Sequence, residues 1–166
     1  MEHKKKPNIK KLVELISDGY EVENINDIIS NLENAIHHPR DYAEKNDLLW
    51  LYDENDINSL SLDFIIPLEL NEIIITGDKI DEIHDQIVDL KEELPEFPFE
   101  EKETAKEYFI WLDNILSETG DEILEIGRSF GDDLTLFLVY KKDTDEIIKI
   151  CQQLNLKCSN PKDTLY

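Results

Sequence analysis

The sequence predicts a single α+β domain: a small, mainly antiparallel sheet packed with several helices, and a helical N-terminal third. Three observations predict this class. Apolar residues recur every three or four positions in several segments, as in helices that bury one face. Three shorter segments carry β-branched or alternating apolar runs, as strands do. A chain of 166 residues, 40% of them hydrophobic, can also bury one ordinary core.

The first 58 residues predict three helices. The lysine-rich start reads as a frayed leader, and the first helix runs from near Pro7 to Gly19. A second begins near Asn26 and ends before Pro39, and a third begins near Asp41. The first two carry Ile9, Leu12, Val13, Ile16, Ile28, Ile29, Leu32, Ala35 and Ile36 at helical spacing. The third is expected to bury Leu48, Leu49 and Leu51, with Trp50 as a further candidate for burial.

The middle of the chain predicts a strand followed by a helix. Residues 63–70 give no clear prediction, because Pro67 interrupts an apolar run. Residues 72–76 predict a strand, since three isoleucines precede Gly77. The helix that follows has a narrow apolar seam made of Ile80, Ile83, Ile87, Leu90 and Leu94.

The last third predicts a helix, a hairpin, another helix and a short strand. The first helix spans residues 101–119 and ends at Gly120, a residue suited to a left-handed cap. Residues 122–128 and 134–140 form the hairpin, and the second strand is central because both of its faces are apolar. Asp143 and Glu146 resemble a capping box for the last helix, before a strand at 156–158. We expect burial at Leu112, Ile115, Leu136, Phe137 and Leu138.

The predicted elements, the apolar runs and the cysteines also indicate the domain organisation and the cellular compartment. Residues 1–166 form one domain, which could divide into a helical subdomain at 8–58 and an α/β subdomain at 70–158. No segment approaches the roughly 20 apolar residues that span a bilayer, and no secretory signal is visible. Two cysteines do not make a disulfide framework, so we expect reduced thiols, Cys151 in the core, and a cytoplasmic protein that does not engage membranes.

Motifs that would indicate catalysis or metal binding are missing. His84 has no second histidine four residues away, and we expect it to be a surface residue among carboxylates. Residues 53–58 lack the glycine of a calcium loop, and residues 127–131 lack the lysine of a phosphate loop, so both are expected to be turns. We therefore expect no cofactor, no metal site and no enzymatic activity.

Charge is the strongest functional signal. Thirty-nine acidic residues against seventeen basic ones give a net charge of −22, which opposes direct nucleic-acid binding and attracts basic proteins. Residues 69–107 alone hold fourteen acidic residues and four lysines, a net charge of −10. Carboxylates interleaved with aromatic residues are typical of surfaces that capture cationic proteins. The partner-binding residues expected on this basis are Glu92, Glu93, Glu96, Phe97, Phe99, Glu100, Glu101 and Glu103.

Parts of the sequence resemble two known families. Residues 73–80, 81–97 and 111–116 resemble the first strand, the first helix with its loop, and the tryptophan-bearing second helix of barstar-like acidic inhibitors of bacterial ribonucleases. The tyrosine-glycine pair of their inhibitory loop is absent, and the match covers under a third of the chain. Residues 125–134 are similar to a glycine-aspartate hairpin of bacterial immunity proteins. Both resemblances imply that the protein neutralises a toxin.

The leading hypothesis is an acidic bacterial immunity protein or antitoxin that binds and blocks a basic toxin, with a nuclease as one candidate. A nucleic-acid mimic that inhibits a DNA-binding defence enzyme is an alternative, and it needs carboxylates along an elongated surface. A non-catalytic regulatory subunit, whose acidity serves solubility, is another. An enzyme of unrecognised type would instead show a deep pocket with convergent polar groups.

Overall fold

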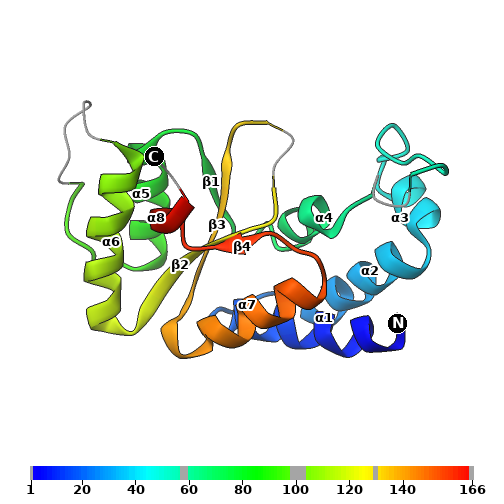
Figure 1. The fold of residues 1–166 in the computed structure, drawn as a ribbon, viewed down its shortest axis with the longest axis horizontal. Helices are drawn as coiled ribbons and strands as arrows, with labels where there is room; N and C mark the ends of the chain where they lie inside the picture. Colours follow the sequence, from blue (N-terminus) through cyan, green and yellow to red (C-terminus); the bar gives the residue numbers. More distant parts are fainter. Residues whose placement is uncertain (1, 57–59, 98–103, 129–130, 165–166) are drawn as a thin grey trace.

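A computed structural model describes residues 2–56, 60–97, 104–128 and 131–164 (Figure 1). It confirms the predicted α+β class, with one four-stranded antiparallel sheet and helices on both of its faces. The elements in this part of the chain are α1 (Glu2–Ser17), α2 (Ile25–His37), α3 (Pro39–Lys45), α4 (Leu62–Glu69), β1 (Ile75–Gly77), α5 (Ile80–Leu90), α6 (Ala105–Thr119), β2 (Asp121–Ile126), β3 (Leu134–Tyr140), η1 (Lys141–Asp143), α7 (Thr144–Gln153), β4 (Cys158–Ser159) and α8 (Pro161–Thr164).

The sheet has the strand order β1-β3-β2-β4, so β3 and β2 are its central strands. The hairpin of β2 and β3 is confirmed, with Ile123 opposite Leu138 and Asp121 opposite Tyr140. β1 is shorter than the predicted strand and begins later, because the chain is still turning at Ile73. β4 likewise begins at Cys158, where the predicted strand was to end.

Two apolar clusters cover the two faces of β3, as the apolar residues on both of its faces predicted. Leu136 and Leu138 belong to the cluster that contains the buried residues of α5 and α6, whereas Phe137 and Val139 belong to the cluster that contains those of α1, α2 and α7. The N-terminal helices therefore share one core with the sheet. Four of the five residues expected to be buried are buried: Leu112, Leu136, Phe137 and Leu138. The fifth, Ile115, is only partly buried and packs against its cluster.

The N-terminal region differs from the prediction at both ends. Its first helix begins at Glu2, so the backbone of the lysine-rich start is helical and is no frayed leader. Pro39 occupies the first turn of α3, a position that tolerates proline because no backbone donor is needed there. α3 ends at Lys45, and Asp47 adopts a left-handed conformation, so Leu49 and Trp50 are 48% and 71% exposed instead of buried.

The ambiguous segment around Pro67 is helix α4. Ser61 caps it by accepting a hydrogen bond from the Asp63 backbone N–H at 3.2 Å. Pro67 has no N–H to donate to the carbonyl of Asp63 four residues earlier. That carbonyl instead accepts from the Arg128 backbone N–H at 2.7 Å. A residue distant in the sequence thus satisfies the group that proline leaves unpaired, and the helix continues.

The predicted caps have different outcomes. Gly120 ends α6 in the left-handed conformation, as expected, and Thr104 begins that helix by accepting from the Glu107 N–H at 3.2 Å. The predicted capping box of α7 does not form: the Asp143 side chain makes no capping hydrogen bond, because Lys141–Asp143 is already a turn of 3₁₀ helix leading into α7.

Candidate functional site

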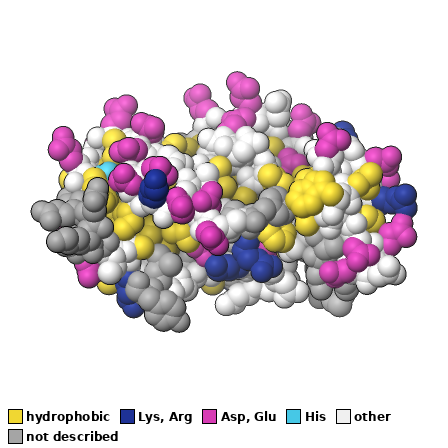
Figure 2. All heavy atoms as spheres, turned by 90° about the horizontal axis from the view of Figure 1, so that it is seen from above, with side chains coloured by type: hydrophobic (Ala, Val, Ile, Leu, Met, Phe, Trp, Pro, Cys, Tyr) yellow, Lys and Arg dark blue, Asp and Glu magenta, His cyan; other side chains and the backbone are white. Residues whose placement is uncertain are grey.

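An acidic face lies on α5 and the segments beside it. We define it by the exposed carboxylates of Asp78, Asp81, Glu82, Asp85, Asp89, Glu92, Glu93 and Glu96. Residues 78–96 contain two basic residues, Lys79 and Lys91, and Lys91 forms an ion pair with Asp121. More widely, Figure 2 shows Asp and Glu side chains scattered over one whole side of the molecule, with Lys and Arg in few places.

Charges along α5 concentrate the negative potential at its C-terminal end. Asp81 and Glu82 lie in the first turn, where carboxylates complement the positive end of the helix dipole. The last turn holds no basic residue and does hold Asp89, which adds to the negative end of the dipole. Lys91 follows at the C-cap, where a cation complements the negative end of the dipole, and its ammonium is paired with Asp121.

His84 is buried beneath this face, and its predicted surface position is wrong. Only 1% of the residue is exposed. Nε2 lies 2.9 Å from the Pro95 carbonyl oxygen, which can only accept, so Nε2 carries the hydrogen. Nδ1 then accepts from the Tyr108 hydroxyl at 2.8 Å. Burial, and then the charge of Asp85, raises the pKa of Tyr108, so this hydroxyl stays a donor.

An aromatic cluster around His84 holds the segment after α5 against α6. The Phe97 ring lies 5.7 Å from those of His84 and Tyr108, centroid to centroid, and the Trp111 ring lies 5.8 Å from that of His84. Phe97, an expected partner contact, is therefore half-buried and anchors this segment. Because Pro95 and Phe97 are both held, the carboxylates of Glu92, Glu93 and Glu96 are presented from a fixed segment.

The expected partner-binding residues fall into two groups. Glu92, Glu93 and Glu96 are exposed and lie on the acidic face, next to Phe97. Phe99, Glu100, Glu101 and Glu103 lie outside the described residues. Sequence reasoning missed His84, although a signal was available: His84 is four residues after Ile80 and three before Ile87, so it belongs to the apolar seam.

The other motifs are structural. Asp53 accepts a hydrogen bond from the Asn55 backbone N–H at 2.9 Å, which makes the start of the calcium-like segment a polar turn, as predicted; residues 57 and 58 are not among those described. Asp63 is buried and accepts from the Arg128 guanidinium at 3.1 Å and from the Lys157 backbone N–H at 2.8 Å. Within residues 2–56, 60–97, 104–128 and 131–164, no group of three or more His, Cys, Asp or Glu is placed to hold a metal ion.

Both cysteines are free thiols, and Cys151 is in the core as predicted. A hydrogen bond with the Cys158 thiol, followed by burial, raises the pKa of Cys151. A thiol held protonated in this way is a poor nucleophile. In the part of the chain that the structure describes, no helix is both long enough and apolar enough to cross a membrane.

Comparison of the chain with known protein families, with curated proteins and with solved structures gives no match.

Proposed function

We propose that this protein is an inhibitor of a basic toxin, of the immunity-protein or antitoxin kind, and that the acidic face binds the toxin. The observation that carries the proposal is the acidic face itself: eight exposed carboxylates on residues 78–96, where the sequence supplies two lysines. The barstar-like stretch of the sequence falls on β1, α5 and α6 and supports the same role.

Electrostatic steering is the first part of the mechanism. A patch of one sign raises the association rate of an oppositely charged protein, by a factor of about 10 to 10³ at low salt. A nuclease would be such a partner, because it holds its substrate's phosphates with basic side chains. Carboxylates of the acidic face would then occupy the positions of those phosphates and block the active site.

Rigidity of the presenting segment is the second part. Binding costs free energy whenever side chains and loops must be ordered at the interface. The hydrogen bond from His84 to Pro95 and the packing of Phe97 hold this segment before any partner arrives. An acidic surface that served only solubility would have no need of such an anchor, so the anchor favours an interface.

The nucleic-acid mimic is less well supported by the dimensions of the acidic face. α5 has 11 residues, which corresponds to about 16 Å of helix. One turn of a DNA duplex spans about 34 Å. The row of carboxylates on α5 is therefore half a turn long, a size that suits the active site of one protein better than a surface that imitates an extended duplex.

The test uses the product of the gene adjacent to this one as the partner and measures association by biolayer interferometry. Changing Glu92, Glu93 and Glu96 together to lysine should slow association at least about tenfold, because these carboxylates supply much of the steering field. A control with the same change in net charge, at the exposed residues Glu14, Glu44 and Glu54, should slow it far less.

Inhibition and association that are unchanged by the first triple variant would refute the assignment of this face. Equal slowing by both triple variants would show that net charge alone attracts the partner.

A further inference from the structure

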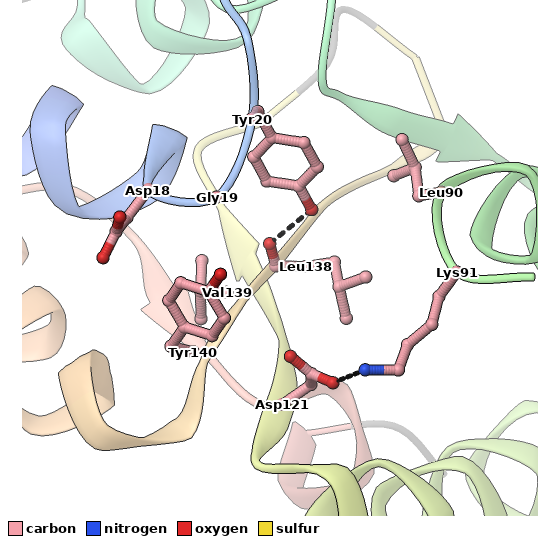
Figure 3. A pocket seen from close by; sticks show the side chains of 9 residues that line it. All are labelled: Asp18, Gly19, Tyr20, Leu90, Lys91, Asp121, Leu138, Val139 and Tyr140. Carbon is pink, nitrogen blue, oxygen red and sulfur yellow. Dashed lines mark hydrogen bonds and ion pairs between the residues drawn. The ribbon is translucent and has the colours of Figure 1, made fainter. Parts of the chain in front are cut away.

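A small cavity lies where the end of α1, the end of α5 and the β2–β3 hairpin meet. Its volume is about 160 Å³. Pockets for drug-sized ligands have volumes of about 300–1,000 Å³, so this one has room for a single side chain and not for a large metabolite. Figure 3 shows the residues that line it: Asp18, Gly19, Tyr20, Leu90, Lys91, Asp121, Leu138, Val139 and Tyr140.

A buried carboxylate stands at one side of this cavity. Asp121 is 6% exposed, pairs with the Lys91 ammonium and accepts a hydrogen bond from the Thr119 hydroxyl at 2.8 Å. Lys91 reaches Asp121 across the cavity from the end of α5 (Figure 3). The Lys91 ammonium thus occupies the position beside Asp121 where a cation from another molecule would bind.

Two tyrosine rings form other walls of the cavity. Tyr20 donates its hydroxyl hydrogen to the Leu138 carbonyl at 2.7 Å, which fixes its ring. Burial, and then the charge of Tyr140, raises the pKa of Tyr20 to about 12, so the hydroxyl stays neutral. Tyr140 lies opposite Asp121 in the sheet, and the Lys142 ammonium lies 5.4 Å from its ring centroid. Aromatic faces attract cations, and the Tyr140 ring already attracts the Lys142 ammonium.

The surroundings of the cavity add negative potential. Leu90 and Lys91 stand at the C-terminal end of α5, where the helix dipole is negative. The exposed carboxylate of Asp18 lies at the edge of the cavity, and Asp89 and Glu92 flank it in the sequence. Two residues of the acidic face are therefore direct neighbours in the sequence of residues that line the cavity.

We propose that this cavity takes the side chain of one arginine from the basic partner. The guanidinium would replace the Lys91 ammonium on Asp121 and stack on a tyrosine ring. Arginine suits the cavity better than lysine, because a planar guanidinium pairs with a carboxylate through two hydrogen bonds and stacks on aromatic rings. Arginines buried in such pockets carry a large share of the binding energy of many interfaces. This inference rests on the proposed function and adds a specific anchor to it.

A titration tests the cavity without the partner. N-acetyl-arginine amide is added to the full chain at low salt, and amide chemical shifts are followed by NMR. Saturable shifts at Gly19, Lys91, Asp121 and Tyr140 are expected, with a millimolar dissociation constant. N-acetyl-lysine amide should bind more weakly, since it cannot form the paired hydrogen bonds.

Two variants, a matched control and a reserve variant make the test specific. Asp121→Asn should weaken binding at least about tenfold, the usual loss for a hydrogen bond to a charged group. Lys91→Met should strengthen binding, because it removes the competing ammonium. A matched control, Lys162→Met, removes the lysine paired with Asp113 in another part of the fold and should leave the binding unchanged. If Asp121→Asn does not fold, Asp18→Lys changes an exposed residue and should weaken binding by repulsion.

The outcomes separate the two proposals. Absence of saturable shifts in both the parent protein and Lys91→Met overturns the cavity, as does equal binding of the lysine derivative or unchanged binding in Asp121→Asn. If the arginine derivative binds but no basic protein partner is found, the arginine site is supported and the proposed function is refuted. Partner affinity that falls in the Glu92, Glu93 and Glu96 variant but is unchanged in Asp121→Asn would support the function and overturn the anchor.

Discussion

Replacement of Gly127 by alanine should destabilise the protein far more than replacement of Gly120. Both glycines have φ of +80°, a conformation that costs a residue with a Cβ about 1–2 kcal/mol. Their surroundings differ. A Cβ on Gly120 would meet no atom within 4 Å, whereas a Cβ on Gly127 would lie 2.4 Å from the Asp63 carbonyl oxygen and 3.0 Å from Pro67 Cγ.

The magnitude follows from these contacts. Gly120→Ala should cost the backbone term alone, about 1–2 kcal/mol. At Gly127 the overlap is with backbone, so β2 and α4 must move apart, and overpacking of this kind costs about 1–3 kcal/mol. Separation also weakens the bond from Arg128 N–H to the Asp63 carbonyl, worth about 1 kcal/mol. We expect a total of about 3–6 kcal/mol for Gly127→Ala, by addition of these terms.

Urea unfolding followed by circular dichroism measures both variants against the parent protein. The difference between the two variants, about 2–4 kcal/mol, is the steric overlap together with the weakened hydrogen bond from Arg128 to Asp63. Equal free energies of unfolding for the two variants would refute the close approach of β2 to α4 and, with it, the account of how Pro67 is accommodated.

Two further predictions concern the anchor and the tyrosines. His84→Leu removes the hydrogen bonds that His84 makes with the Tyr108 hydroxyl and the Pro95 carbonyl, and should cost about 2–4 kcal/mol in urea unfolding, with faster amide exchange at residues 92–96. Tyr108→Phe removes one of these two bonds and should cost less. Unchanged exchange in His84→Leu would contradict the anchoring role. The pKa of Tyr20 is about 12 in the folded protein, against 10.0 for an ordinary tyrosine such as that of the unfolded chain. The unfolded state therefore loses its proton first, and the folded state loses stability as the pH rises from about 10 through 12. Tyr20→Phe should reduce that loss of stability, measured as the change of melting temperature with pH.

Local patterns in the sequence were sufficient for the fold class and for most elements. β3 was predicted as a covered central strand, because both of its faces are apolar over seven residues and only a strand between two helical layers buries both. The helical spacing of α1, α2, α5 and α6 predicted most of their buried faces for the same reason. The seam predicted for α5 was wrong at its end, because the helix stops at Leu90, which is exposed, and Leu94 is buried beyond it. Exposure of Glu92, Glu93 and Glu96 also followed from composition, since unpaired carboxylates remain in water.

Contacts between distant segments decided what these patterns could not. The spacing of His84 places it in the apolar seam of α5, but its hydrogen-bond partners, Tyr108 on α6 and the Pro95 carbonyl, come from other segments that the seam does not reveal. Pro67 remains within a helix because Arg128 satisfies the carbonyl that proline leaves free. The cavity needs Tyr20, Lys91 and Asp121 together, from segments separated by many residues. A local pattern reports which face of an element is apolar; which polar groups meet there depends on how the elements pack.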